Sequence, residues 1–283
     1  MAQVPPLVST SWLADQLGQP GIAVIDATYH LPTVKRDARA EYEREHIPGA
    51  QFFDVDKISD PKSDLPHMLP ASADFARTVE ALGIGNDDHV IAYDSYGLMS
   101  AARPWWMFRI FGHDCVSVLD GGLPKWKREG RALTGAASAP ARGKTFRPTF
   151  RPEMVRSKDQ LLANLGNLAE QVLDARAAGR FQGTAPEPRQ GLRSGHIPGS
   201  HNLPFNRLLD ASDQTMLPAE QLKRLFAEAG IDAGKPIVTS CGSGVTACVL
   251  ALGLEQIGAK RVAIYDGSWS EWGLPGNTPV ESG

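Results

Sequence analysis

The feature that most constrains this chain is an internal repeat, in which three motifs recur in the same order at offsets of 150, 148 and 146 residues. The three pairs are 46–49 and 196–199 (His-Ile-Pro-Gly in both), 24–27 and 172–175 (Val-Ile-Asp-Ala and Val-Leu-Asp-Ala), and 120–126 and 266–272 (Asp-Gly followed by Trp). Ordered motifs at nearly constant spacing indicate a duplication. A chain of 283 residues is also long for one core, so we expect two similar domains.

Each half also repeats one order of predicted elements. A short apolar run predicts a buried strand, a second run leads into a small-residue loop and a helical pattern, and a third ends in an Asp-Gly turn. Strands that alternate with helices predict an α/β fold, with a mainly parallel sheet flanked by helices in each half. The predicted boundaries are a first domain at 1–134, a linker at 135–151 that is rich in Ala, Pro, Arg and Lys, and a second domain at 152–283.

Composition excludes several classes of protein. The net charge is −3, so the sequence does not predict a nucleic-acid or anionic-membrane partner. No stretch approaches the roughly 18 apolar residues of a membrane span, and the first residues lack the features of a secretory or transit signal. We therefore expect a cytoplasmic protein. Its 3 cysteines, Cys115, Cys241 and Cys248, form no metal-binding spacing.

The second half places Cys241 between a predicted strand at 236–240 and a predicted helix at 245–257. The intervening glycines, Gly242 and Gly244, allow successive amide N–H groups to point into one concave cradle. Those donors and the positive end of the helix stabilise an anion at the sulfur and favour the thiolate. Cys241 is therefore a candidate nucleophile, and its persulfide anion would be held by the same groups.

Two other readings of this loop stay open, a phosphate-binding loop and a buried structural cysteine. Cysteine-dependent phosphatases fit poorly, because they need an arginine six positions after the cysteine to clamp phosphoryl oxygens. Here that position is Ala247, and no arginine lies between Cys241 and Lys260.

The repeated His-Ile-Pro-Gly and Asp-Gly…Trp motifs, with one cysteine loop in the second half, resemble the tandem rhodaneses over essentially the whole chain. The resemblance implies two rhodanese-like domains and a sulfurtransferase that needs no metal or organic cofactor. The loop Cys-Gly-Ser-Gly-Val-Thr-Ala at 241–247 is similar to that of the 3-mercaptopyruvate sulfurtransferases. Relatives that use thiosulfate typically carry basic residues at the positions of Gly242 and Ser243, and this chain has none there.

The same resemblance implies roles for further residues. An insertion at 179–189 has no counterpart in the first half, and its Arg180 and Arg189 match the pair that binds the substrate carboxylate and ketone. Ser243, His67 and Asp56 match a proton relay, with His67 as base and Asp56 orienting its ring. The loop residues assigned to substrate binding are Gly242, Gly244, Val245 and Thr246.

The first half contains no matching cysteine. The 146-residue offset places Ser95 opposite Cys241, and a serine does not readily form a persulfide, so we expect this half to be catalytically silent. The His-Ile-Pro-Gly histidines and the repeated Trp126 and Trp272 occur in both halves, which favours structural roles for them.

These inferences predict a double displacement. Cys241 takes sulfur from a small-molecule donor, 3-mercaptopyruvate, releases pyruvate, and passes the sulfur to a thiol acceptor such as thioredoxin, or to cyanide in an assay. A thiosulfate sulfurtransferase on the same scaffold and a non-enzymatic sulfide- or anion-binding module remain the alternatives.

Overall fold

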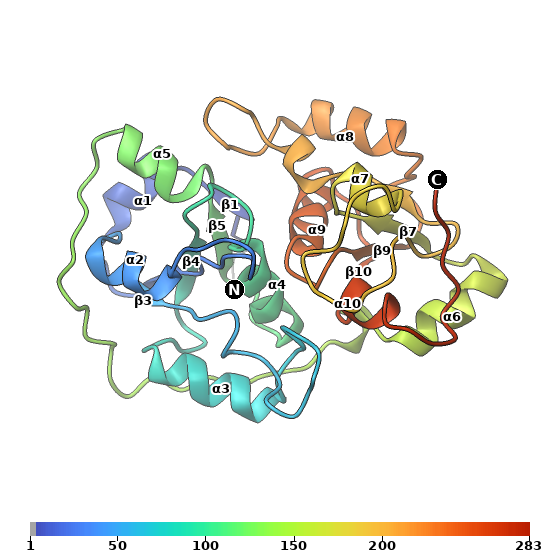
Figure 1. Cartoon of the computed structure of the whole chain (residues 1–283). Coiled ribbons are helices and arrows are strands. Elements are labelled where there is room, and N and C mark those ends of the chain that lie inside the picture. Colours follow the sequence, from blue (N-terminus) through green and yellow to red (C-terminus); the bar gives the residue numbers. More distant parts are fainter. Residues whose placement is uncertain (1–3) are drawn as a thin grey trace. The chain divides into compact units, whose positions relative to one another are not determined.

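The computed structural model describes residues 4–283 and divides them into two compact units (Figure 1). The chain passes from the first unit to the second between Arg151 and Pro152. Two short segments depart from this simple division, because 62–68 belongs to the second unit and 210–216 belongs to the first. Within the described residues, no helix is long and apolar enough to cross a membrane.

Each unit is built on a five-stranded parallel sheet, and the two sheets share one strand order. The first has the order β1-β5-β4-β2-β3, formed by β1 (Leu7–Val8), β2 (Ile22–Asp26), β3 (Gln51–Phe52), β4 (His89–Tyr93) and β5 (Val116–Leu119). The second has the order β6-β10-β9-β7-β8, formed by β6 (Val155–Arg156), β7 (Gln171–Asp174), β8 (His201–Asn202), β9 (Ile237–Ser240) and β10 (Val262–Tyr265). The predicted duplication and the α/β class are therefore confirmed.

Helices cover both faces of the first sheet. They are α1 (Thr10–Gln16), α2 (Ala38–Arg44), α3 (Ser72–Ala81), α4 (Ala102–Ile110) and α5 (Gly122–Arg128). Side chains of α1, α2 and α5, among them Leu13, Tyr42 and Trp126, share one core cluster with Ile91 of β4. The preceding residue of β4, Val90, points to the opposite face because side chains alternate along a strand. The aromatic side chains of α3 and α4 pack against each other, with Phe75 and Phe108 ring centroids 5.2 Å apart.

The second unit repeats this arrangement with α6 (Lys158–Asn167), α7 (Ala178–Phe181), α8 (Ala219–Glu228), α9 (Ala247–Gln256) and α10 (Ser268–Trp272). The unit also contains two 3-10 turns, η1 (Pro152–Met154) before β6 and η2 (Phe205–Leu208) after β8. A full capping box formed by Ser157 and Gln160 fixes the start of α6. Eight residues of α9, 247–254, are buried, which explains why its sequence is apolar or small on most faces.

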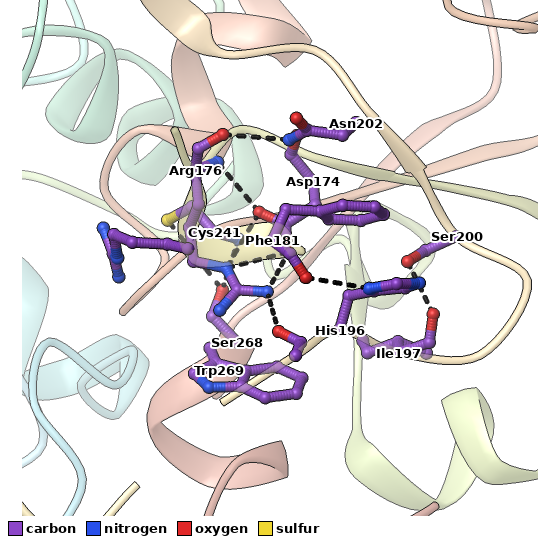
Figure 2. Close-up of polar contacts among 12 residues, drawn as sticks. Asp174, Arg176, Phe181, His196, Ile197, Ser200, Asn202, Cys241, Ser268 and Trp269 are labelled. Carbon is purple, nitrogen blue, oxygen red and sulfur yellow. Dashed lines mark hydrogen bonds and ion pairs between the residues drawn. The ribbon is translucent and has the colours of Figure 1, made fainter. Parts of the chain in front are cut away.

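The repeated histidines and tryptophans hold equivalent places in the two units. His46 stacks on Tyr42 and bonds its carbonyl through Nδ1 at 2.7 Å, while His196 stacks on Phe181 and bonds that carbonyl at 2.8 Å (Figure 2). The indole N–H groups of Trp126 and Trp272 each donate to a carbonyl oxygen, at 2.8 and 2.7 Å. Neither motif touches the cysteine loop through these bonds, which agrees with structural roles.

The segment 135–151, which the sequence predicts as a linker, contains no helix or strand and packs along the first unit. The Phe146 side chain is buried and its amide donates to Glu80 Oε1 at 2.8 Å. The amide of Thr149 donates to the carbonyl of Phe111 at 2.8 Å. The segment is therefore anchored to the helical face formed by α3 and α4.

Candidate functional site

Cys241 follows β9 directly and starts the six-residue loop 241–246 that leads into α9. Its side chain is buried. Among residues 4–283, the main-chain amides of Gly242, Ser243, Val245 and Thr246 are paired with no acceptor. A buried loop with several unpaired N–H groups next to a sulfur has the composition of an anion cradle. We call 241–246 the sulfur loop.

The position equivalent to Cys241 in the first unit is Asp94, and the prediction of Ser95 is wrong. Sheet register shows the correspondence, because Tyr93 pairs with Asp26 as Ser240 pairs with Asp174. In the same way, the carbonyl of Asp94 accepts from Leu123 at 3.0 Å, as that of Cys241 accepts from Trp269 at 3.0 Å. The first loop, 94–101, is two residues longer than the sulfur loop, while the stretch from the helix start to the Asp-Gly motif is one residue shorter in the first unit. The 146-residue offset, taken at Asp120 and Asp266, is therefore one residue off at Asp94.

The Asp94 carboxylate fills its own loop. Its Oδ2 atom accepts the amides of Met99, Ser100 and Ala101, each at 2.8 Å, and its Oδ1 atom accepts the amide of Tyr96 at 2.8 Å. Counting back from the first helical residue, the three amides on Oδ2 correspond to those of Gly244, Val245 and Thr246. The first unit therefore keeps the cradle but satisfies it with a built-in anion, a second reason for this half to be silent.

His67 and Ser243 come together within the second unit. His67 Nδ1 lies 3.0 Å from Ser243 Oγ and 3.2 Å from Ser243 O, and both side chains are buried. A carbonyl oxygen only accepts hydrogen bonds, so the second contact places the proton on Nδ1. Ser243 Oγ then accepts from His67, which leaves its own proton available to a neighbouring atom.

Asp56, the third member of the predicted relay, belongs to the first unit. It lines a cavity of about 480 Å³ together with His30 and Arg36. Its carbonyl accepts from Ser59 Oγ at 2.6 Å, which closes the turn that carries it. An action of Asp56 on the His67 ring stays a prediction.

Arg180 is placed against the sulfur loop. A Cβ built on Gly242 would lie 3.0 Å from Arg180 Nη2, so the guanidinium occupies the space beside this glycine. Arg180 Nη2 also donates to Glu187 Oε2 at 2.5 Å. Arg189 is half-buried on the same insertion, and its role in binding substrate stays a prediction.

The Rhodanese-like domain model matches this chain twice, at residues 9–129 and 157–274. The chain belongs to the rhodanese family.

Relatives of this rhodanese cover nearly its whole length. It is 47% identical over 297 residues to "Thiosulfate/3-mercaptopyruvate sulfurtransferase 1, mitochondrial" of Arabidopsis thaliana, covering 98% of this chain and 78% of the relative. It is also 47% identical to the 3-mercaptopyruvate sulfurtransferase of Homo sapiens, over 94% of this chain and 91% of the relative. The crystal structure of SseA from Escherichia coli, described as a 3-mercaptopyruvate sulfotransferase, superposes with a TM-score of 0.84 at 40% identity, covering 95% of this chain and 100% of that one.

The rhodanese also contains a buried ionic network that sequence reasoning missed. Arg176, fully buried at the end of β7, pairs with Asp174 at 2.7 Å and Glu187 at 2.8 Å, and its guanidinium lies 4.2 Å from the Trp269 ring centroid (Figure 2). Burial lowers the pKa of Arg176, but the two carboxylates outweigh it and the pKa is raised above its ordinary value. Since Glu187 also holds Arg180, the network fixes the guanidinium beside Gly242.

The counterpart of this network in the first unit lacks the arginine. Thr28 stands at the position of Arg176, and it donates its amide and hydroxyl to Asp26 Oδ1 at 2.9 and 2.5 Å. Burial without a cation raises the pKa of Asp26 to about 6. The ionic cluster is thus a property of the cysteine-bearing half. Two features of the sequence could have signalled it: Arg176 stands two residues after Asp174, and the insertion at 179–189 occurs only in the second half.

Proposed function

We propose that this rhodanese moves sulfur from 3-mercaptopyruvate to a thiol acceptor through a persulfide on Cys241, releasing pyruvate. The observation that carries the proposal is the pairing of an anion cradle with one fixed cation, Arg180, pressed against the neutral Gly242. A donor with one carboxylate needs one such cation next to the sulfur, and bidentate guanidinium contacts also orient it. The names of the relatives, which include both mercaptopyruvate and thiosulfate, support the sulfurtransfer chemistry.

In the first half-reaction, the Cys241 thiolate attacks the donor's sulfur. An S–S bond forms as the donor's C–S bond breaks, and that electron pair passes into the enolate of pyruvate, which is then protonated. Arg180, with Arg189, binds the donor's carboxylate and ketone oxygens and stabilises the developing enolate charge. The amides of the sulfur loop hold the new persulfide anion.

The donor's thiol proton leaves through Ser243. The Ser243 hydroxyl accepts it while passing its own proton to His67, which requires the imidazole to present an unprotonated Nδ1. The resting hydrogen bonds favour a proton on Nδ1, so donor binding must shift the tautomer. A role of Asp56 in orienting the His67 ring stays a prediction.

In the second half-reaction, an acceptor thiolate attacks the outer sulfur and returns Cys241 to the thiolate. A protein dithiol such as thioredoxin fits this step, because its second thiol then releases the transferred sulfur as sulfide and forms a disulfide. Cyanide takes the same sulfur as thiocyanate in an assay.

The test is a parallel steady-state assay with 3-mercaptopyruvate and thiosulfate as donors to cyanide, using the native protein and Cys241→Ser. We expect mercaptopyruvate to be preferred by orders of magnitude and the variant to be inactive. Preference for thiosulfate would overturn the donor assignment but keep the persulfide. Full activity of Cys241→Ser, or no reaction with either donor, would overturn the sulfurtransferase itself.

A further inference from the structure

Ser268, at the start of α10, makes more contacts with the sulfur loop than its sequence position suggests. Its Oγ accepts the amides of Cys241 and Gly244, both at 3.1 Å. The same hydroxyl donates to the carbonyl of Tyr265 at 2.8 Å and lies 4.0 Å from Cys241 Sγ. A serine hydroxyl has two acceptor sites and one proton, so all of its hydrogen-bonding capacity is directed at this loop and its immediate support.

The backbone of Ser268 is strained in the left-handed region, with φ at 49°. A non-glycine residue adopts this conformation at a cost and persists there only where its surroundings impose it. Here the following amides are bound to the same loop, Trp269 N to Cys241 O at 3.0 Å and Ser270 N to Gly242 O at 2.8 Å. This left-handed conformation therefore places the Ser268 hydroxyl within hydrogen-bond distance of the Cys241 and Gly244 amides.

The silent unit shows what replaces this serine. Its equivalent is Gly122, with φ at 52°, and a Cβ built there would lie 2.7 Å from Asp94 O and 2.6 Å from Gly97 O. No serine fits at that position. The Met99 amide, equivalent to that of Gly244, is accepted instead by Asp94 Oδ2 at 2.8 Å. The Asp94 carboxylate in one unit and the Ser268 hydroxyl in the other thus accept the equivalent amides of Met99 and Gly244.

We infer that Ser268 is a positioning residue for sulfur transfer: its hydroxyl holds the sulfur loop in its anion-binding shape while no sulfur is bound. When the Cys241 thiolate forms, the hydroxyl proton turns from Tyr265 O toward Cys241 Sγ. The silent unit needs no such residue, because the Asp94 carboxylate itself accepts three of its loop amides. This inference rests on the proposed persulfide chemistry of Cys241.

Two substitutions separate positioning from stability. Ser268→Gly removes the hydroxyl and relieves the left-handed strain, which offsets part of the stability lost when two loop amides lose their acceptor, so it should melt at a higher temperature than Ser268→Ala. Ser268→Ala removes the hydroxyl and keeps the strain. In both variants we expect kcat with 3-mercaptopyruvate to fall on the order of 100-fold, as for loss of one preorganised donor, with KM within about threefold because Arg180 is untouched.

A readout independent of donor and turnover is the ultraviolet absorbance of the Cys241 thiolate against pH, with Cys241→Ser as the baseline. Both Ser268 variants should form the thiolate only at higher pH than the native protein. The matched control is Ser117→Ala, a fully buried serine in β5 whose hydroxyl donates to Pro5 O at 2.6 Å, and it should leave kcat and the thiolate titration unchanged.

Native kcat and an unshifted thiolate titration in a folded Ser268→Gly would overturn the inference. So would a loss of kcat in Ser268→Ala that only matches its loss of folded protein. If the native protein uses neither donor, the proposed function fails, while the thiolate titration still decides the role of Ser268.

Discussion

The guanidinium of Arg180 lies so close to the Gly242 backbone that a Cβ on this glycine would approach Nη2 to 3.0 Å. The close approach of the guanidinium therefore favours glycine at 242, and the backbone conformation does not, because Gly242 is not in the left-handed region. The contact links Arg180 of the insertion to the sulfur loop. The residue type at position 242 therefore affects how Arg180 binds the donor's carboxylate.

Replacing Gly242 by arginine should weaken mercaptopyruvate binding. A second guanidinium would repel Arg180 and displace it from the donor's carboxylate, so we expect KM to rise on the order of tenfold, equivalent to about 1.4 kcal/mol. Gly242→Ala is the control, because the flexible end of Arg180 can shift by a few tenths of an ångström. An unchanged KM in Gly242→Arg would contradict the assigned role of Arg180.

Removing the charge of Glu187 should destabilise the second unit and loosen the site. Its buried carboxylate joins Arg176 at 2.8 Å to Arg180 at 2.5 Å. With Glu187→Gln, the buried Arg176 keeps Asp174 as its anionic partner and Gly195 O as an acceptor, so we expect unfolding in urea to require about 2 kcal/mol less free energy, and KM for mercaptopyruvate to rise. Glu220→Gln, which breaks an exposed pair with Lys223, should leave stability close to that of the native protein. Equal stability of both variants would refute the network's importance.

The Asp94→Ala substitution should destabilise the first unit by about 3 kcal/mol, because three buried or part-buried amides lose their acceptor. Added acetate should raise the melting temperature of this variant in a saturable manner and leave the native protein unaffected. Asp94→Asn, which keeps one acceptor oxygen, should lose less. A melting temperature of Asp94→Ala that equals the native value, with or without acetate, would show that the loop does not depend on an anion.

Asp26 should give the first unit a pH-dependent stability. Its pKa is raised to about 6 from 3.8 by burial, although hydrogen bonds from Thr28 lower it in part. A raised acid pKa means that the folded state binds the proton more tightly, so this stabilisation is present below about pH 4 and is lost as pH rises through about 6. The shift corresponds to about 3 kcal/mol.

Asp26→Asn lacks this titration. The stability difference between variant and native protein, measured by urea unfolding at pH 4 and pH 7, should therefore move by about 3 kcal/mol in favour of the variant at pH 7. A difference that stays constant between the two pH values would show that Asp26 does not titrate as its burial implies.

The repeated motifs were sufficient to predict the duplication, the parallel sheets and the position of Cys241, because strand ends and turns depend on local sequence. The position of Asp94 was missed for a physical reason. An offset taken at one motif applies at another only if the intervening loops have equal lengths. The loops 94–101 and 241–246 differ in length although both form the same cradle. Sheet register, which hydrogen bonds fix, is visible only in three dimensions.

The remaining site residues depend on tertiary contacts. Arg176 and Glu187 lie 11 positions apart, the first just after β7 and the second on the insertion, and nothing in their spacing predicts a shared ion pair. Ser268 follows an Asp-Gly turn whose sequence signals only a bend. His67 was identified by resemblance, and its contact with Ser243 spans 176 positions of the chain.

The two units exchange short segments, because 62–68 belongs to the second unit and 210–216 to the first. A fragment beginning at Pro152 would retain Cys241 but would lose 62–68, the segment that supplies His67 to Ser243. A fragment ending at Arg151 would lose 210–216, from which Met216 donates its amide to Asp120 at 2.7 Å. Cutting the chain between Arg151 and Pro152 therefore yields no fragment that contains every segment of its own unit.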